Sequence, residues 1–180
     1  MSKESLCRLE DEISACRLCS LWQGRVHTVP GAGPVPARLM LVGEAPGREE
    51  DLSGKPFVGR GGRLLDRALE QAGLDRSEIF ITSVIKCRPP DNRKPLKKET
   101  ASCLPYLEAQ MEIVRPKVVC LLGNTAAAAV LGRQGIQALR GRIWEERFAV
   151  TYHPAAVLRN RNLMADFVSD LERLNSLQDK

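Results

Sequence analysis

The stretch LMLVGEAPGREEDLSGKPFVGRGG, residues 39–62, decides the expected fold because it joins an apolar strand to a long loop. Residues 39–42 are apolar without interruption, as in strands that are buried on both faces. The loop after them contains six glycines and two prolines, with the apolar Pro56-Phe57-Val58 at its centre. Glycines let a backbone approach a ligand closely, and prolines stiffen a loop. Because loops of this length within domains are usually functional, we interpret it as one wall of a binding pocket.

Segments with helical and strand-like patterns alternate along the chain. Helices are expected over residues 2–15, 62–72, 97–114, 125–131 and 163–177, and strands over residues 38–42, 79–85, 117–122 and the end of a hairpin at 141–150. This alternation, with continuously apolar strands, indicates a parallel sheet covered by helices on both faces. Gly73 is expected to cap the second helix, and Pro105 to kink or interrupt the third. Residues 1–180 are expected to form a single domain.

The composition favours a cytoplasmic protein with an anionic partner. No apolar run is long enough to cross a bilayer, and the N-terminal MSKESLCRLEDEISAC is too polar for a secretion signal, so no membrane contact is expected. The net charge is +5, and positive residues gather in two loops. They are Arg88, Arg93, Lys94, Lys97 and Lys98 in one loop, and Arg159 and Arg161 in the other.

The candidate site residues follow the carboxyl ends of the expected strands, where open parallel sheets bind their ligands. His153 there is either a structural hydrogen-bonding residue or a catalytic one. Glu44 is either solvated or functional, and the acidic residues 49–51 are candidates for solvation. Phe57 either packs in the core or stacks on a planar ligand. The residues expected at this edge are Gly43-Glu44-Ala45, residues 83–87, Gly123-Asn124 and His153-Pro154.

Four cysteines form a C-x2-C…C-x15-C set, namely Cys16, Cys19, Cys87 and Cys103. Four thiolates hold either a zinc ion or an iron–sulfur cluster. The remaining alternative is four buried thiols, because disulfides are rare in the cytosol. Cys7 and Cys120 lack such partners and are expected to be packing residues.

Several long motifs occur in order: CRLC at 16–19, GEAPGREED at 43–51, GKPFVGRGG at 54–62, KCRPPDNRKP at 86–95, Cys103, and HPAAVLRN at 153–160. In these motifs the chain resembles the family 4 uracil-DNA glycosylases, the iron–sulfur branch of that superfamily. The resemblance implies a three-layer α/β/α sandwich around a four-stranded parallel sheet. It also implies hydrolysis of the N-glycosidic bond of uracil in DNA, the first step of base excision repair. The four cysteines are then ligands of a [4Fe–4S] cluster.

The resemblance also implies a role for each residue of the pocket. Phe57 stacks on a base that has left the helix, and His153 donates a hydrogen bond to uracil O2. Glu44 positions the water or stabilises the cationic sugar. Gly43, Glu44 and Ala45 line the edge of the base, and Leu158, Arg159 and Asn160 contact the DNA, with Leu158 as a candidate wedge. A monomer is expected, since one lesion needs one site.

Ser83 departs from the family pattern, which usually has asparagine within the second-strand motif. An asparagine amide can donate to uracil O4 and accept from N3–H together, whereas a serine hydroxyl has a shorter reach. Weaker or broader base recognition, extending to hypoxanthine or xanthine, is one hypothesis. The other is that Ser83 transfers these contacts to a water molecule.

Two other functions fit parts of the sequence. A uracil- or DNA-binding module of the same fold would keep the pocket without the reaction. A redox protein would use the cluster for electron transfer, but it has no need of Phe57, the His-Pro-Ala-Ala turn or the arginine-bearing segment after it. We therefore expect a DNA glycosylase.

Overall fold

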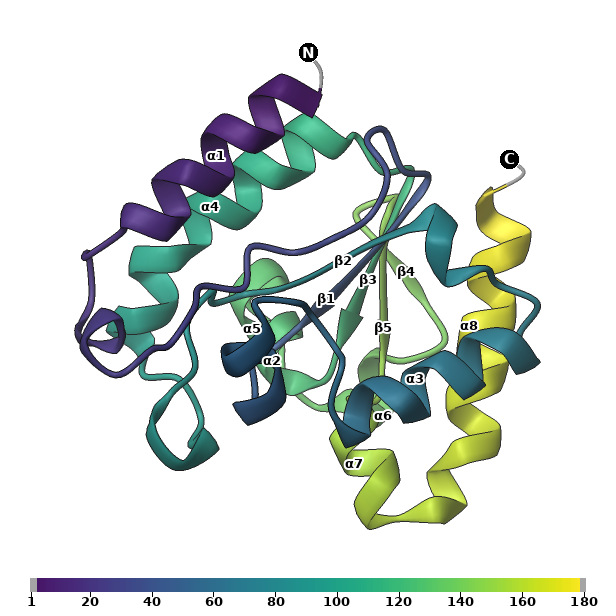
Figure 1. The fold of residues 1–180 in the computed structure, drawn as a ribbon. Helices are drawn as coiled ribbons and strands as arrows, with labels where there is room; N and C mark the ends of the chain where they lie inside the picture. Colours follow the sequence, from purple (N-terminus) through teal and green to yellow (C-terminus); the bar gives the residue numbers. More distant parts are fainter. Residues whose placement is uncertain (1–2, 179–180) are drawn as a thin grey trace.

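A five-stranded sheet forms the centre of the computed structural model, which describes residues 3–178 (Figure 1). The strands are β1 (Leu39–Gly43), β2 (Ile79–Ser83), β3 (Val118–Leu122), β4 (Ile143–Trp144) and β5 (Phe148–Thr151). Their order is β2-β1-β3-β5-β4, and the first four in this order run parallel. The short β4 pairs antiparallel with β5, which gives the expected hairpin and adds a fifth strand to the expected four.

Helices cover both faces of the sheet, so the expected α/β/α sandwich is confirmed (Figure 1). The longer helices are α1 (Lys3–Ala15), α3 (Arg60–Gln71), α4 (Lys97–Val114), α5 (Asn124–Leu131) and α8 (Met164–Gln178). The shorter ones are α2 (Arg48–Ser53), α6 (Ile136–Leu139) and α7 (Pro154–Arg159), with 3-10 turns η1 (Ser20–Gln23), η2 (Arg76–Glu78), η3 (Pro90–Asn92) and η4 (Arg161–Leu163). Residue 2, where the first helix was expected to begin, lies outside the described residues.

The strands are apolar throughout because successive side chains enter opposite cores. Leu39 and Leu41 of β1 pack in one cluster with α3, α7 and α8. Met40 and Val42 pack in the other cluster with α1, α4 and α5. β1, β2, β3 and β5 are therefore buried at every position.

Gly73 ends α3 as predicted, through a left-handed turn. Its φ is +70°, its amide donates to the Glu70 carbonyl at 3.1 Å, and the Leu74 amide donates to the Leu69 carbonyl at 2.9 Å. This pair of bonds is a Schellman motif, in which glycine adopts the left-handed conformation without strain from a Cβ. The turn directs the chain from α3 towards β2.

Pro105 does not interrupt α4, which continues from Lys97 to Val114. A proline in a helix removes one hydrogen bond to the carbonyl four residues earlier. That carbonyl belongs to Ala101, and both residues are exposed, so water can replace the lost donor. Within residues 3–178, no helix has the length and apolar character needed to cross a membrane.

Candidate active site

The expected site residues meet where the parallel strands end. Gly43 at the end of β1 is paired with Ser83 at the end of β2, which sets these two ends level. His153 follows β5, two residues after Thr151. A cleft of about 1220 Å³ opens at this edge of the sheet. Its lining includes Glu44, Ala45, Phe57, Ser83, His153 and Arg159.

Three predicted residues are not among those that line the cleft. Gly43 is buried behind the Phe57 ring. Leu158 is half-buried and packs against the core on the α3 side of the sheet. Asn160 is exposed, and its side chain accepts a hydrogen bond from the Asn162 amide at 3.2 Å, which caps η4. Of the expected DNA-contacting segment, Arg159 lies at the cleft.

Phe57 is 8% exposed and lies against Gly43. A Cβ added at Gly43 would lie 2.6 Å from Phe57 Cζ and 3.2 Å from Ser83 Oγ, so a larger residue would displace the ring. The ring centroid lies 5.9 Å from that of His153, with the planes tilted by 38°. Because Phe57 has a φ of +51°, its backbone occupies a region that bulky residues rarely adopt.

Glu50 holds the loop that carries Phe57. Its Oε1 atom accepts hydrogen bonds from the amides of Val58 at 2.9 Å and Gly59 at 2.8 Å. Its Oε2 atom accepts from the Gly47 amide at 3.1 Å, at the start of α2. Glu50 was a candidate for solvation, and this interpretation is wrong. Its position three residues after a glycine that begins a helix is the sequence signal for this capping contact.

Asp51 was also a candidate for solvation and is instead 3% exposed. Its Oδ1 atom accepts a hydrogen bond from the Val26 amide at 3.0 Å, and its carbonyl accepts from the His27 amide at 3.1 Å. The side chain therefore joins α2 to the segment that precedes β1. Glu49 is exposed, in agreement with the expectation.

His153 is held as a neutral ring with a defined tautomer. The Ala155 amide lies 3.1 Å from Nδ1, and because an amide N–H can only donate, Nδ1 is the acceptor. Burial lowers the pKa of His153 to about 4, and the nearby Arg159 contributes in the same direction. The neutral ring then carries its proton on Nε2, which remains available as a hydrogen-bond donor.

Thr125 orients Glu44, a contact that sequence reasoning missed. The Thr125 hydroxyl, in the first turn of α5, donates a short hydrogen bond to Glu44 Oε2, and both residues are half-buried. Gly123 precedes α5 with a φ of +91°, and a Cβ there would lie 2.9 Å from His153 Cβ. Glycine at this position lets the segments after β3 and β5 approach each other, which brings Thr125 near the site.

The four cysteines expected to act as ligands line one cavity beside α4. The cavity is lined by Cys16, Cys19, Cys87 and Cys103, with Arg25, Lys86 and Tyr106 among its other residues. Burial raises the pKa of Cys87, and it raises the pKa of Cys103 to about 11. Within residues 3–178, all six cysteines are free thiols, and no cluster of histidine, cysteine or acidic residues has ready-made metal-binding geometry.

Two cations adjoin these thiols. Arg25 donates to Cys87 Sγ at 3.3 Å and to the Cys16 carbonyl at 2.9 Å. Lys86 is 1% exposed, and its Nζ donates to Thr82 Oγ1, the Ser83 carbonyl and Gln110 Oε1 at 2.8, 2.6 and 2.7 Å. Burial lowers the pKa of Lys86 to about 7, an effect that the nearby Cys103 opposes. Arg25 therefore brings a positive charge to the thiols, whereas burial makes the Lys86 ammonium lose its proton more readily than an ordinary lysine does.

The other two cysteines differ from each other. Cys120 is 1% exposed in β3 and is a packing residue as expected. Cys7 is exposed, so the expectation that it packs in the interior is wrong. The inward face of α1 is formed by Leu6, Leu9 and Ile13, which follow the helical period, and Cys7 lies off this face.

Basic residues surround the cleft, but their charges are not equally available. The lining includes Arg48, Arg60, Arg63, Arg93, Lys94 and Arg159. Arg93 forms two hydrogen bonds with the buried Glu99, at 2.9 and 2.7 Å. This bidentate pair lowers the pKa of Glu99 and anchors the loop before α4, so Arg93 is structural in part.

The sheet order, the cleft beyond its strands and the aromatic and histidine side chains in that cleft define a class of protein. The sequence model of the uracil DNA glycosylase superfamily matches residues 30–175, and the chain belongs to this superfamily. The expected family is thus confirmed.

Within the superfamily, the chain is similar to proteins named Type-4 uracil-DNA glycosylase. The protein from Sulfurisphaera tokodaii is 41% identical over 187 aligned residues, which cover 97% of this chain and 85% of the relative. The one from Archaeoglobus fulgidus is 41% identical over 189 residues, covering 98% and 95%. The one from Thermotoga maritima is 37% identical over 188 residues, covering 99% and 98%. These similarities extend over nearly the full length of the chain.

Proposed function

We propose that this chain is a type-4 uracil-DNA glycosylase, which hydrolyses the N-glycosidic bond of uracil in DNA and so initiates base excision repair. The observation that carries the proposal is the neutral His153 beside the Phe57 ring, in a cleft at the carboxyl ends of the strands. The cleft exceeds the usual 300–1,000 Å³ of small-molecule pockets and has a basic rim, which fits a nucleic acid better than a free base.

The proposed reaction begins with a nucleotide that has rotated out of the DNA helix. Its uracil stacks on Phe57 and is bounded by Glu44 and Ala45, which follow β1 and line the cleft. The C–N bond breaks with its electron pair remaining on the base, while Nε2–H of His153 donates to O2, where negative charge develops. Water then adds to the sugar carbon, and the proton that it loses passes through solvent to the uracil anion, which leaves as neutral uracil. Glu44, oriented by Thr125, positions this water or stabilises the cationic sugar.

Arg159 is the proposed phosphate contact of the segment after His153. It is exposed and lines the cleft, so it can reach the DNA backbone. Leu158 would act as a wedge only after leaving its contacts with the core. We assign the positioning of DNA to the arginine for this reason. All proposed site residues come from one chain, so a monomer suffices.

We infer that Cys16, Cys19, Cys87 and Cys103 hold a [4Fe–4S] cluster. The donor set fits, because four thiols line one cavity and a cluster uses four thiolates. The surroundings fit as well, since Arg25 donates to Cys87 and the buried Lys86 adjoins Cys103, and both can balance the negative charge of the thiolates. When bound, the cluster supplies a cross-link between the end of α1 and the segment from β2 to α4.

A glycosylase assay tests the proposed function. Oligonucleotides that contain a single uracil, hypoxanthine or xanthine are incubated with the protein, and abasic sites are then cleaved with alkali. We expect strand scission at uracil. Scission at none of the three bases by protein with its full iron content would contradict the proposal and favour a module that binds DNA without cleaving it.

Ser83→Asn tests base specificity in the same assay. Ser83 is 5% exposed and level with Gly43, so its hydroxyl lies at the inner end of the pocket. We expect the asparagine variant to release uracil about 10-fold faster, because its amide can bind O4 and N3–H together, each such bond contributing about 1 kcal/mol. We also expect it to lose any activity on hypoxanthine or xanthine. Equal rates and equal base preference in the two proteins would show that Ser83 does not determine specificity.

A further inference from the structure

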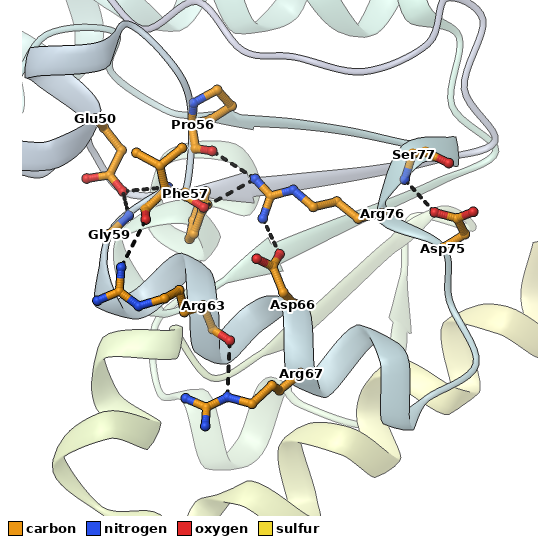
Figure 2. A network of polar contacts seen from close by, with 11 residues as sticks. Glu50, Pro56, Phe57, Gly59, Arg63, Asp66, Arg67, Asp75, Arg76 and Ser77 are labelled. Atoms are coloured by element: carbon orange, nitrogen blue, oxygen red, sulfur yellow. Dashed lines mark hydrogen bonds and ion pairs between the residues drawn. The ribbon is translucent and has the colours of Figure 1, made fainter.

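Arg76 contacts the Phe57 loop from a segment outside the family motifs. It begins η2, the short turn between α3 and β2, and Asp75 caps this turn by accepting a hydrogen bond from the Ser77 amide at 2.8 Å. The turn places the Arg76 side chain alongside the middle of α3, at Asp66, with its guanidinium towards Pro56 and Phe57 (Figure 2). The capped turn therefore fixes the position of the Arg76 backbone, from which the side chain extends.

The Arg76 guanidinium binds two consecutive carbonyls of the loop. Its Nη2 atom donates to the carbonyl of Pro56 at 2.9 Å and to that of Phe57 at 3.2 Å. Its Nη1 atom forms a short ion pair with Asp66 of α3, which orients the group (Figure 2). Glu50 binds the next two amides of the same loop. Arg76 thus holds residues 56 and 57 through their carbonyls, and Glu50 holds residues 58 and 59 through their amides.

The Phe57 backbone needs such restraint. Its φ of +51° lies in the left-handed region, which an aromatic residue adopts only when its surroundings enforce it. The Phe57 carbonyl also lies against the first turn of α3, because a Cβ added at Gly62 would be 1.8 Å from its oxygen. Arg76 binds this same oxygen, so it opposes the peptide rotation that would return Phe57 to an ordinary φ and move its ring.

We propose that Arg76, oriented by Asp66, is a positioning residue that fixes the Phe57 ring for stacking on the flipped base. The inference rests on the proposed function, since it takes Phe57 as the stacking residue. The ion pair is partly exposed, with 33% of the Arg76 side chain and 46% of the Asp66 side chain accessible. Such pairs contribute little to global stability, so the effect of Arg76 is local to the loop.

The test compares Arg76→Met with Arg67→Met. Arg67 is an exposed cation on α3 whose Nε donates to the Arg63 carbonyl of its own helix at 3.3 Å, so its loss changes the charge equally without touching the loop. The single-turnover rate of uracil release is expected to fall about 10-fold in Arg76→Met. A fall of this size means that about one tenth of the molecules keep the loop in the productive conformation. The rate of Arg67→Met is expected to equal that of wild type, and equal rates in both variants would overturn the proposal.

A double-mutant cycle separates positioning from general damage. In a Phe57→Ala background, Arg76→Met should have no further effect on the rate, because the ring that it positions is absent. The same 10-fold loss in both backgrounds would contradict the proposed role. Arg76→Lys keeps the charge but cannot bind two carbonyls and Asp66 in the guanidinium geometry, so an intermediate loss is expected. This variant also serves if the methionine variant folds poorly.

Amide hydrogen exchange provides a measurement that does not depend on activity. The amides of Val58 and Gly59 should exchange faster in Arg76→Met than in wild type and Arg67→Met, while amides of β1 remain unchanged. Unchanged exchange at Val58 and Gly59 would overturn the proposal that Arg76 holds the loop. A wild-type protein without activity on uracil would instead overturn the proposed function, and the exchange experiment would still decide whether Arg76 holds the loop.

Discussion

Replacing His153 with alanine is expected to lower the single-turnover rate of uracil release by about 10²- to 10³-fold, the usual effect of removing a preorganised donor from a developing oxyanion. The expectation follows from the hydrogen bond between the Ala155 amide and Nδ1, which leaves Nε2–H as the donor towards the cleft. His153 also caps the N-terminus of α7, so the thermal midpoint of the variant should be measured alongside its rate.

His153→Asn is the matched control for this prediction. Asparagine can cap α7 through its carbonyl oxygen and donate through its amide, so part of the lost rate should return. Both variants lack the imidazole, and only the alanine variant lacks a donor. Equal rates in the two variants would show that donation at this position is unimportant.

The pH dependence of the stability and of the rate of the wild-type protein follows from the burial of His153, which lowers the pKa of this residue. Because the pKa of His153 is lowered to about 4, the ring stays neutral as the pH falls from 8 through the ordinary value of 6.5. The unfolded chain takes up a proton near 6.5, so the contribution of His153 to stability is complete above that pH and is lost as the pH falls towards 4. A fall in rate centred near pH 6.5 that is absent in His153→Asn would contradict the neutral donor.

The fold was predictable because the strands carry their own signal. Residues 118–122 and 39–42 are apolar at every position, which occurs where both faces of a strand are covered. The end of β2 was predicted wrongly, since the strand was expected over residues 79–85. Val84 and Ile85 are as apolar and buried as the strand, yet β2 ends at Ser83. Apolar composition reports burial, and it does not distinguish a strand from the buried segment that follows it.

The convergence of Glu44, Phe57 and His153 was also predictable, since parallel strands bring their carboxyl ends to one edge. The residues that orient them were not. Apart from the capping contact of Glu50 with Gly47, the partners of Glu50, Arg76 and Thr125 lie between 8 and 81 positions away along the chain. All three Glu50 contacts and both loop contacts of Arg76 are to backbone atoms. A backbone acceptor or donor has no side-chain identity, so outside a local motif such as the capping position of Glu50 the sequence does not mark it as a partner.

Replacing Cys87 with alanine is expected to remove the proposed [4Fe–4S] cluster and to destabilise the protein by about 3–5 kcal/mol, or about 10 °C in the thermal midpoint, as loss of a structural metal site does. Cys87 is connected to the N-terminal segment even without a cluster, because Arg25 donates to its sulfur and also to the carbonyls of Cys16 and Ser14. Iron content and the visible absorption of the cluster report its loss directly.

Cys7→Ala is the control for this variant, since Cys7 is an exposed thiol on the same helix that precedes Cys16. It should keep the iron, the absorption and the thermal midpoint of wild type. In Cys87→Ala, the segment between α1 and β1 loses both the cross-link and the sulfur that Arg25 binds, so limited proteolysis should cut there first. Full iron content in Cys87→Ala would exclude this residue as a ligand. If Cys87→Ala loses its iron but keeps the thermal midpoint and the proteolysis pattern of wild type, then the wild-type protein binds a cluster that does not hold the N-terminal segment in place.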